Sequence, residues 1–218
     1  MTLDFSVVLT QWPSLLDGLA LTVGLTLIAA VFGTLLGIAC GVIRSKGPQW
    51  ARSLVGAYVE LIRNTPFIIQ LFFIFFGLPG LGLTMTALTA AILANVINLG
   101  AYVSEIARSG IEATPSGQIE AAESLALDRW QVFTRVILPP ALKRVWPALV
   151  GQMVIIMLGS AVCSQISAQE LSYAANQIAS SSFRNFETYI VVAALYLLLS
   201  IALRRLLNWA GPRFIFGR

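Results

Sequence analysis

Four polar side chains recur at helical spacing inside an otherwise apolar stretch. They are Asn95, Asn98, Tyr102 and Glu105, separated by three, four and three residues. This spacing places all four on one face of a helix. Amide, phenol and carboxylate groups on such a face can bind a polar solute, and polar groups within a membrane span usually face a bundle interior or a watery path. Hydrogen bonding between helices would turn the same face inward, so both interpretations stay open.

Two further groups are candidates for handling a solute. Ser160 and Gln165 interrupt a later apolar stretch, and the four-residue spacing of Ser160 and Ser164 would put both hydroxyls on one helix face. Glu60 and Arg63 lie near the inner end of another span. They could form a gate or contact a charge on the solute, and a salt bridge that stabilises the chain at this point is an equally good interpretation.

The elements that carry these residues are predicted to be membrane spans. The chain has 218 residues, 57% hydrophobic and 11% charged, whereas a soluble domain has roughly a quarter charged residues. Five stretches approach the ~20 helical residues that cross a bilayer: Leu19–Ile43, Pro66–Leu83, Met85–Ala107, Ala148–Ile166 and Tyr189–Leu207. We therefore expect an all-α integral membrane protein with five transmembrane helices, in which residues 1–218 form one domain.

The basic residues predict the orientation of these spans. Of the 14 lysines and arginines, all but Arg63 and Arg184 fall on one side if the five helices alternate. The positive-inside rule makes that side cytoplasmic. The N-terminus is then outside and the C-terminus is inside. Because the basic residues flank spans instead of forming one patch, the charge gives no reason to expect nucleic-acid binding.

Several activities lack the residues they need. Histidine is absent and Cys163 has no evident base beside it, so neither a metal site nor a membrane-embedded enzyme is indicated. The chain has no G-x-x-x-x-G-K-[ST] sequence and should not bind ATP by a P-loop. A self-contained channel or secondary transporter is a further alternative, but no inverted repeat is evident.

Two patterns predict local packing. Gly33, Gly37 and Gly41 are four residues apart, and small residues at this spacing let two helix backbones approach closely. Pro66 follows Asn64-Thr65 and cannot donate to the helical hydrogen-bond ladder. We expect a kink or a new helix start there.

A polar, charged island at residues 108–146 separates two of the spans. Gln118–Leu125 is predicted to be a short helix, and Asp128 with Gln131 gives a capping-box pattern for a second helix that stops before Pro139-Pro140. Ala121, Ala122 and Leu125 would form one small apolar face on this hairpin, between Glu120 and Glu123. Such a face can dock closely into a groove of another protein.

The island resembles the EAA loop of ATP-binding cassette (ABC) importer permeases, whose pattern is E-A-A-x3-G-x9-I-x-L-P. Glu120, Ala121, Ala122, Leu138 and Pro139 match it at the right spacing. Ala126 stands for the glycine and Val136 for the isoleucine. Glycine favours a left-handed turn, which costs another residue about 1 kcal/mol, so this turn is a candidate for reshaping.

Other segments resemble the polar amino-acid branch of the same family. They are Gly18 with Thr22, Tyr58–Pro66, Gln70–Ile74 and Gly100–Ile106. The resemblance implies a type I ABC importer permease (MetI-like) fold in a bacterial inner membrane. It also implies import of a polar amino acid, or alternatively of an opine, a compatible solute or another small polar compound.

The resemblance further implies partners. Cytoplasmic ATPase subunits would bind ATP and Mg²⁺, so this chain itself would need no cofactor and would not be an enzyme. The ATPase would be coupled through Glu120, Ala121, Ala122, Ala126 and Leu127. An extracytoplasmic solute-binding protein would deliver the solute.

One departure concerns the second permease chain. Many relatives carry a K-D-T-S-like run where this sequence has Leu158, Gly159, Ser160 and Ala161. If a different permease subunit supplies the missing charged pair, the transporter is a heterodimer. We favour this hypothesis, although a homodimer remains an alternative.

Overall fold

A computed structural model describes residues 3–215, and this part of the chain is helical without β-strands. Four continuous helices are long and apolar enough to cross a membrane: Trp12–Lys46, Ala87–Glu112, Arg129–Ile166 and Asn185–Arg213. A fifth span exists if the bent pair Gln49–Arg63 and Phe67–Leu81 is counted as one. The all-α prediction and the five-span prediction are consistent with this architecture.

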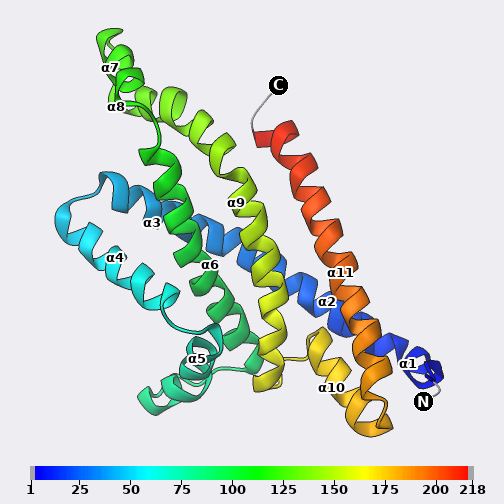
Figure 1. Cartoon of the computed structure of the whole chain (residues 1–218). Coiled ribbons are helices and arrows are strands. Elements are labelled where there is room, and N and C mark those ends of the chain that lie inside the picture. The colour runs from blue at the N-terminus through cyan, green and yellow to red at the C-terminus, as the bar shows by residue number, and fades with distance from the viewer. Residues whose placement is uncertain (1–2, 216–218) are drawn as a thin grey trace.

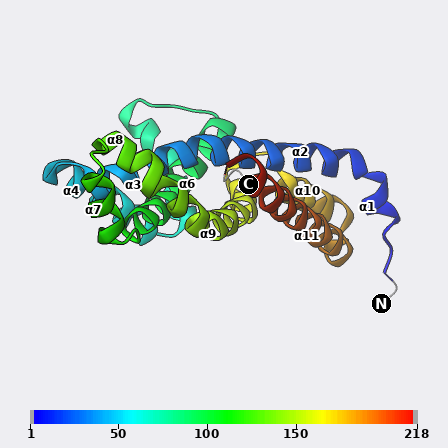
Figure 2. The ribbon, with the colours of Figure 1, turned by 90° about the horizontal axis from the view of Figure 1, so that it is seen from above.

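The first span consists of α2 (Trp12–Ile28), the π-helical segment η1 (Ala29–Gly33) and α3 (Thr34–Lys46). The short helix α1 (Ser6–Thr10) precedes it. The first span therefore begins earlier than the predicted Leu19. Seen from above, α2 runs along one side of the bundle, with α1 at one end and α4 (Gln49–Arg63) near the other (Figure 2).

The second span is not the straight helix predicted over Pro66–Leu83. After α4 the chain bends by 109°. It continues as α5 (Phe67–Phe72), the π-helical segment η2 (Phe73–Gly77) and the 3₁₀ helix η3 (Leu78–Leu81). Pro66 lies at the bend, as predicted, because proline has no N–H to continue the ladder of α4.

Helix α6 (Ala87–Glu112) leads into α7 (Ser116–Ser124), and α8 (Arg129–Gln131) begins the next long helix. The prediction that this helix stops before Pro139-Pro140 is wrong. The π-helical segment η4 (Val132–Ile137) leads directly into α9 (Leu138–Gly159), so Pro139 and Pro140 lie inside one continuous helix, next to its π-helical turn.

The chain then forms the 3₁₀ helix η5 (Ser160–Ile166), α10 (Leu171–Ser182), α11 (Asn185–Ala210) and η6 (Gly211–Ile215). In a 3₁₀ helix, residues three apart share a face. Ser160 and Ser164 therefore do not, contrary to the prediction, which assumed a continuing α-helix.

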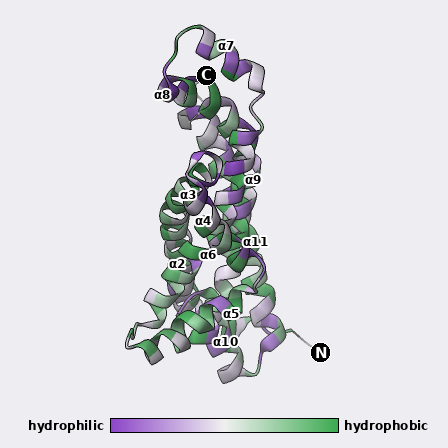
Figure 3. Ribbon diagram, turned by 90° about the vertical axis from the view of Figure 1, so that its left-hand side faces the viewer, coloured by the Kyte–Doolittle hydropathy of each residue, from purple (hydrophilic) through white to green (hydrophobic). Residues whose placement is uncertain are grey.

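The ends of the bundle differ in polarity from its middle. Helices α7 and α8 lie at the same end as the C-terminal part of the chain, whereas α10 and the N-terminal part lie at the other end (Figure 1). The hydrophobic residues are concentrated between these ends (Figure 3). This distribution is expected for a chain whose middle lies in hydrocarbon.

The glycine pattern of the first span mediates close packing, as predicted. A Cβ atom on Gly37 would lie 2.4 Å from Cβ of Val103, and one on Gly41 would lie 2.8 Å from Cβ of Ala107. Gly33 similarly faces Leu99 of α6. The three glycines therefore allow α3 to lie directly against α6.

Candidate functional site

The hairpin at α7 and α8 keeps the left-handed turn although it lacks glycine. Ala126 has φ +58°. The Ala126 N–H donates to the Glu123 carbonyl at 2.9 Å and the Leu127 N–H donates to the Ala122 carbonyl at 3.3 Å. These two bonds form a Schellman motif, which closes the C-terminus of α7. The possible reshaping of this turn does not occur.

The second half of the hairpin begins with the predicted capping box. Asp128 Oδ1 accepts hydrogen bonds from the N–H groups of Trp130 and Gln131 at 2.8 and 2.9 Å. The Gln131 side chain in turn accepts from the Asp128 N–H at 3.0 Å. A Schellman motif and a capping box only a few residues apart give the connection between α7 and α8 a defined shape.

The residues of the hairpin divide into a buried and an exposed set. Ala122 is buried against Ile111, Val132 and Ile137, so it packs inside the hairpin and not on the apolar face expected from the sequence. Leu127 is partly buried in the same cluster. The exposed set includes Glu120, Ala121, Glu123, Leu125, Ala126 and Trp130.

Two exposed residues change the expected docking surface. Leu125 is 77% exposed and Trp130 is 72% exposed, at the tip of the hairpin. Sequence reasoning missed Trp130 as a candidate, although a tryptophan in the first turn of a polar helix was the available signal. Large exposed apolar side chains at such a tip are typical of a protein contact.

Part of the predicted polar face of α6 lines a cavity of about 320 Å³. Asn98 and Tyr102 lie on one wall, and Gln152, Ile155 and Gly159 of α9 lie on another. The elbow between α4 and α5 forms the remaining wall through Thr65, Pro66 and Phe67. The cavity thus joins the three elements that flank the predicted solute path.

Gln70 holds the elbow against α6, next to this cavity. Its amide nitrogen donates to the carbonyls of Ile62 at 2.7 Å and Thr65 at 2.9 Å, which lie at the end of α4. Its carbonyl oxygen accepts from Asn98 at 2.9 Å. Gln70 therefore satisfies the broken end of α4 and connects it to α6, a role that its position in the sequence does not reveal.

The other predicted path residues lie elsewhere. Asn95 is buried and donates to the Ala91 carbonyl at 2.8 Å and to Cys163 Sγ at 3.5 Å. Ser160 is buried and donates to the Met157 carbonyl at 2.7 Å. Gln165 is exposed. These three side chains do not line the cavity between α6 and α9.

Glu105 is the centre of an ion-pair cluster. It pairs with Arg44 at the end of α3 and with Arg108 one turn along α6, and Arg63 lies 3.6 Å away. Arg63 also lies over the Tyr102 ring, 5.6 Å from its centre. The predicted contact between Glu60 and Arg63 is not among the ion pairs of the described residues.

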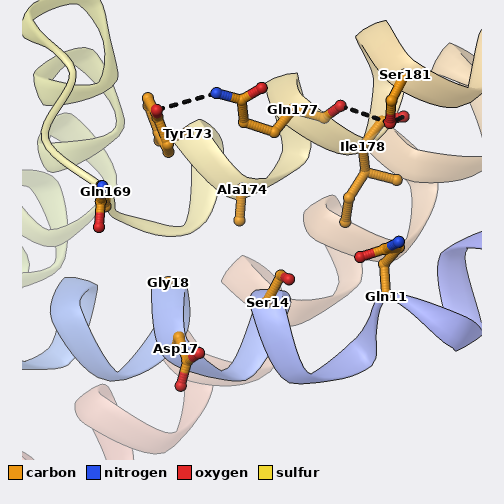
Figure 4. Close-up of a pocket in the computed structure, with 10 residues that line it drawn as sticks. All are labelled: Gln11, Ser14, Asp17, Gly18, Gln169, Tyr173, Ala174, Gln177, Ile178 and Ser181. Carbon is orange, nitrogen blue, oxygen red and sulfur yellow. Dashed lines mark hydrogen bonds between the residues drawn. The ribbon is translucent and has the colours of Figure 1, made fainter.

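The opposite end of the bundle carries a polar groove of about 430 Å³ between α2 and α10. Gln11, Ser14 and Asp17 line it from the α2 side, and Tyr173, Gln177 and Ser181 line it from α10, whose Ala174 and Ile178 point toward α2 (Figure 4). We call this the outer groove. It borders the polar segment 167–188, which contains Glu170, Arg184 and Glu187.

A buried acidic residue, Glu170, stabilises the start of α10 beside the outer groove. Glu170 accepts from the Tyr173 N–H at 2.9 Å and from the Tyr196 hydroxyl at 2.7 Å. Burial raises the pKa of its carboxyl group above the ordinary value. Gly18 and Thr22 complete the junction, since a Cβ atom on Gly18 would lie 2.9 Å from Leu171 Cα and Thr22 Oγ1 accepts from the Leu171 N–H at 3.2 Å.

Bent and continuous helices around a small cavity that carries a few polar side chains, with a polar hairpin at one end, are typical of a membrane-embedded transport subunit. The model of the family described as "binding-protein-dependent transport system inner membrane component" matches residues 33–216. The chain belongs to this family, and the fold expected from the EAA-loop resemblance is confirmed.

Individual relatives cover nearly the whole chain. The glutamine transport system permease protein GlnP of Escherichia coli (strain K12) is 32% identical over 210 residues, which are 95% of this chain and 96% of that protein. The nopaline transport system permease protein NocM of Agrobacterium fabrum is 30% identical over 224 residues, covering 96% of this chain and 93% of that protein.

Solved structures agree with the fold. The crystal structure of an amino acid ABC transporter with histidines matches with a TM-score of 0.88 and 35% identity, over 96% of this chain and 98% of that one. An inward-facing structure of the MetNI methionine ABC transporter matches with a TM-score of 0.72 over 91% and 97% of the two chains. Its identity of 23% supports the fold alone.

Proposed function

We propose that this chain is the permease subunit of an ATP-driven importer for polar amino acids and that its hairpin couples solute movement to partner ATPases. One observation carries the proposal: the hairpin is the direct connection between the two helices that line the cavity. Helix α6 contributes Asn98 and Tyr102, and α9 contributes Gln152. A displacement of α7 by a cytoplasmic partner therefore acts on both walls, as required of a two-state element biased at a distance.

The coupling contact is assigned to the exposed side of the hairpin. Glu120, Ala121 and Ala126 remain candidates because they are exposed. Leu125 and Trp130 join them as apolar anchors. We assign Ala122 and Leu127 the supporting role of packing the hairpin from inside. ATP and Mg²⁺ would be bound by the partner subunits.

Charge reversal at Glu120 tests this assignment. We expect Glu120→Lys in proteoliposomes with the partner ATPase to lower both solute uptake and solute-stimulated ATP hydrolysis, while the amount of inserted permease is unchanged. Glu120→Gln is the milder control, because it removes the charge and keeps the shape. Full uptake by Glu120→Lys would refute the coupling role.

The substrate class is proposed from the relatives and the cavity. Relatives are described as glutamine and arginine permeases, and the cavity has amide and phenol groups from Asn98, Tyr102 and Gln152. The relative described as a nopaline permease favours an opine as the second candidate. Uptake of labelled glutamine or arginine, competed with nopaline, discriminates between them.

The hairpin end is proposed to be cytoplasmic, within a bacterial inner membrane, with residues 108–146 as the coupling loop. Basic residues gather at this end, and the outer groove would then receive the solute-binding protein. Ser181→Cys at the outer groove should react with a membrane-impermeant thiol reagent in intact cells. Ser124→Cys in the hairpin should react only after permeabilisation. The reverse labelling would contradict the orientation.

A second, different permease subunit is proposed as the partner in the membrane. Leu158, Gly159, Ser160 and Ala161 bring no charge to the region of the cavity, although Gly159 lines it. A heterodimer would let the other subunit supply the charged pair. If purification from the native membrane recovers two copies of this chain and no other permease chain, the transporter is a homodimer.

A further inference from the structure

A second cavity lies at the hairpin end of the membrane, outside the solute path. It has a volume of about 450 Å³ and lies between the end of α3, one side of α4 and the end of α6. The side chains that line it are mainly charged or polar: Arg44, Gln49, Arg52, Ser53, Glu60, Arg108 and Glu112. We call it the arginine cavity.

Donors in the arginine cavity remain available. Arg52 is exposed and forms no salt bridge with any residue the structure describes. Arg108 is already paired through its terminal nitrogens with Glu105 and Glu112, so Arg52 is the arginine that is free to bind a ligand. Ser53 and Gln49 add neutral donors beside Arg52. This set suits a phosphate group, which accepts several hydrogen bonds at once.

The neighbouring surface places the cavity at the level of lipid headgroups. Helix α4 buries Val59 and Ile62 against the bundle but exposes Trp50 (73%), Leu54 (67%) and Leu61 (65%) on another side. A helix with one apolar exposed face and one charged face lies in the membrane interface, where tryptophan is also enriched. The exposed apolar residues place α4 at headgroup depth, and the arginine cavity with Arg52 lies on the charged side of the same helix.

The ion pairs around the cavity leave an excess of positive charge. Four arginines lie in or beside it: Arg44, Arg52, Arg63 and Arg108. Three carboxylates accompany them: Glu60, Glu105 and Glu112. Four minus three leaves one positive charge, and this favours an anionic headgroup over a zwitterionic one.

We propose that the arginine cavity binds the phosphate of an anionic phospholipid. The site is connected to the solute path through α4, since the far end of this helix is the elbow whose Thr65 and Pro66 line the path cavity. A lipid bound at Arg52 would therefore restrain α4 relative to α6 and favour one position of the elbow.

The test uses the full chain in nanodiscs of phosphatidylglycerol or phosphatidylcholine. Native mass spectrometry after mild delipidation reports the retained lipids, and thermal unfolding reports the stabilisation by each lipid. We expect preferential retention of phosphatidylglycerol and a roughly fivefold loss of affinity in Arg52→Ala, the factor that corresponds to about 1 kcal/mol. Arg204→Ala removes an exposed arginine of α11 outside the cavity and should leave retention unchanged.

Three results would overturn the proposal. They are equal retention of the two lipids by the unmodified chain, equal losses in Arg52→Ala and Arg204→Ala, and displacement of the lipid by inorganic phosphate, which would make the site one for free phosphate. Arg52→Lys keeps the charge on an exposed side chain and should retain most of the lipid, which guards against loss by misfolding. Because both leaflets of a nanodisc are alike, the outcome does not depend on the orientation proposed above.

Discussion

Arg63 pairs with Glu105 across the bundle, with 3.6 Å between Nη1 and Oε2, and not with Glu60 on its own helix. The contact connects the end of α4 to α6 directly beside the cavity that Tyr102 lines. Because Arg44 and Arg108 bind the same carboxylate, the position of the elbow depends on a charge cluster shared by three helices.

Removing the central charge should destabilise this cluster. In Glu105→Gln three arginines would face one another without their common counter-ion, and we expect the free energy of unfolding to fall by about 1–3 kcal/mol. Thermal or denaturant unfolding in nanodiscs measures this. Glu112→Gln is the control, because Glu112 is 47% exposed and its one ion pair among residues 3–215 is with Arg108, so its loss should cost less than about 1 kcal/mol. Equal losses would contradict the central position of Glu105.

The backbone strain at Ala126, the left-handed residue of the hairpin, can be relieved by glycine. Ala126→Gly should stabilise the end of α7 by up to about 1 kcal/mol, because glycine adopts φ +58° without the steric penalty of a Cβ atom. Slower hydrogen exchange of the Leu127 amide would report it. Ala121→Gly in the exposed middle of α7 should have the opposite sign, at about 0.5–1 kcal/mol. Faster exchange in Ala126→Gly would argue against strain in this turn.

The packing of α3 on α6 should be sensitive to single methyl groups. Gly37→Ala puts a Cβ atom 2.4 Å from Val103 and 2.8 Å from the Gly100 carbonyl, so we expect a loss of about 1–3 kcal/mol. Gly24→Ala is the matched control, since nothing lies within 4 Å of its Cβ position. It should be neutral or slightly stabilising because alanine favours the helix. Denaturant midpoints of the two variants would separate these outcomes.

Glu170 should make the outer region sensitive to pH. Burial raises the pKa of this carboxyl group above its ordinary value of 4.5, so the folded state favours the protonated form. Its contribution to stability is therefore complete below the unfolded pKa and is lost as the pH rises through the folded pKa. Glu170→Gln retains an uncharged hydrogen-bonding group and should remove this loss of stability as the pH rises above 4.5. An unchanged pH profile of thermal unfolding would contradict the role of burial.

The sequence predicted features that depend on local spacing. The polar face of α6, the close approach at Gly33, Gly37 and Gly41, and the capping box at Asp128 all follow from residues three or four apart on one helix. Such spacings are set by the geometry of a single turn, so one sequence is enough to identify them.

Contacts between helices were less accessible. Gln70 reaches Asn98, and Thr22 receives the Leu171 N–H, over separations of 28 and 149 residues. No periodicity within one helix specifies such a pair. Likewise the bend at Pro66 was predicted but not its angle of 109°, because the angle depends on what the two halves pack against. Arg63 lies at the end of α4 beside this bend, and its pairing with Glu105 instead of Glu60 was not predicted either.

The coupling claim is tested most directly by a reporter on the cavity wall. Phe67 lines the cavity, and Cys40 and Cys163 are buried, so Phe67→Cys offers the accessible thiol for a spin label in the assembled transporter. We expect the mobility of the label to change when a non-hydrolysable ATP analogue binds the partner ATPase, and this change to disappear when Glu120→Lys is added. Transmission through the hairpin would be contradicted if the mobility of the label did not change on nucleotide binding. It would also be contradicted if the change were equally large in Glu120→Lys.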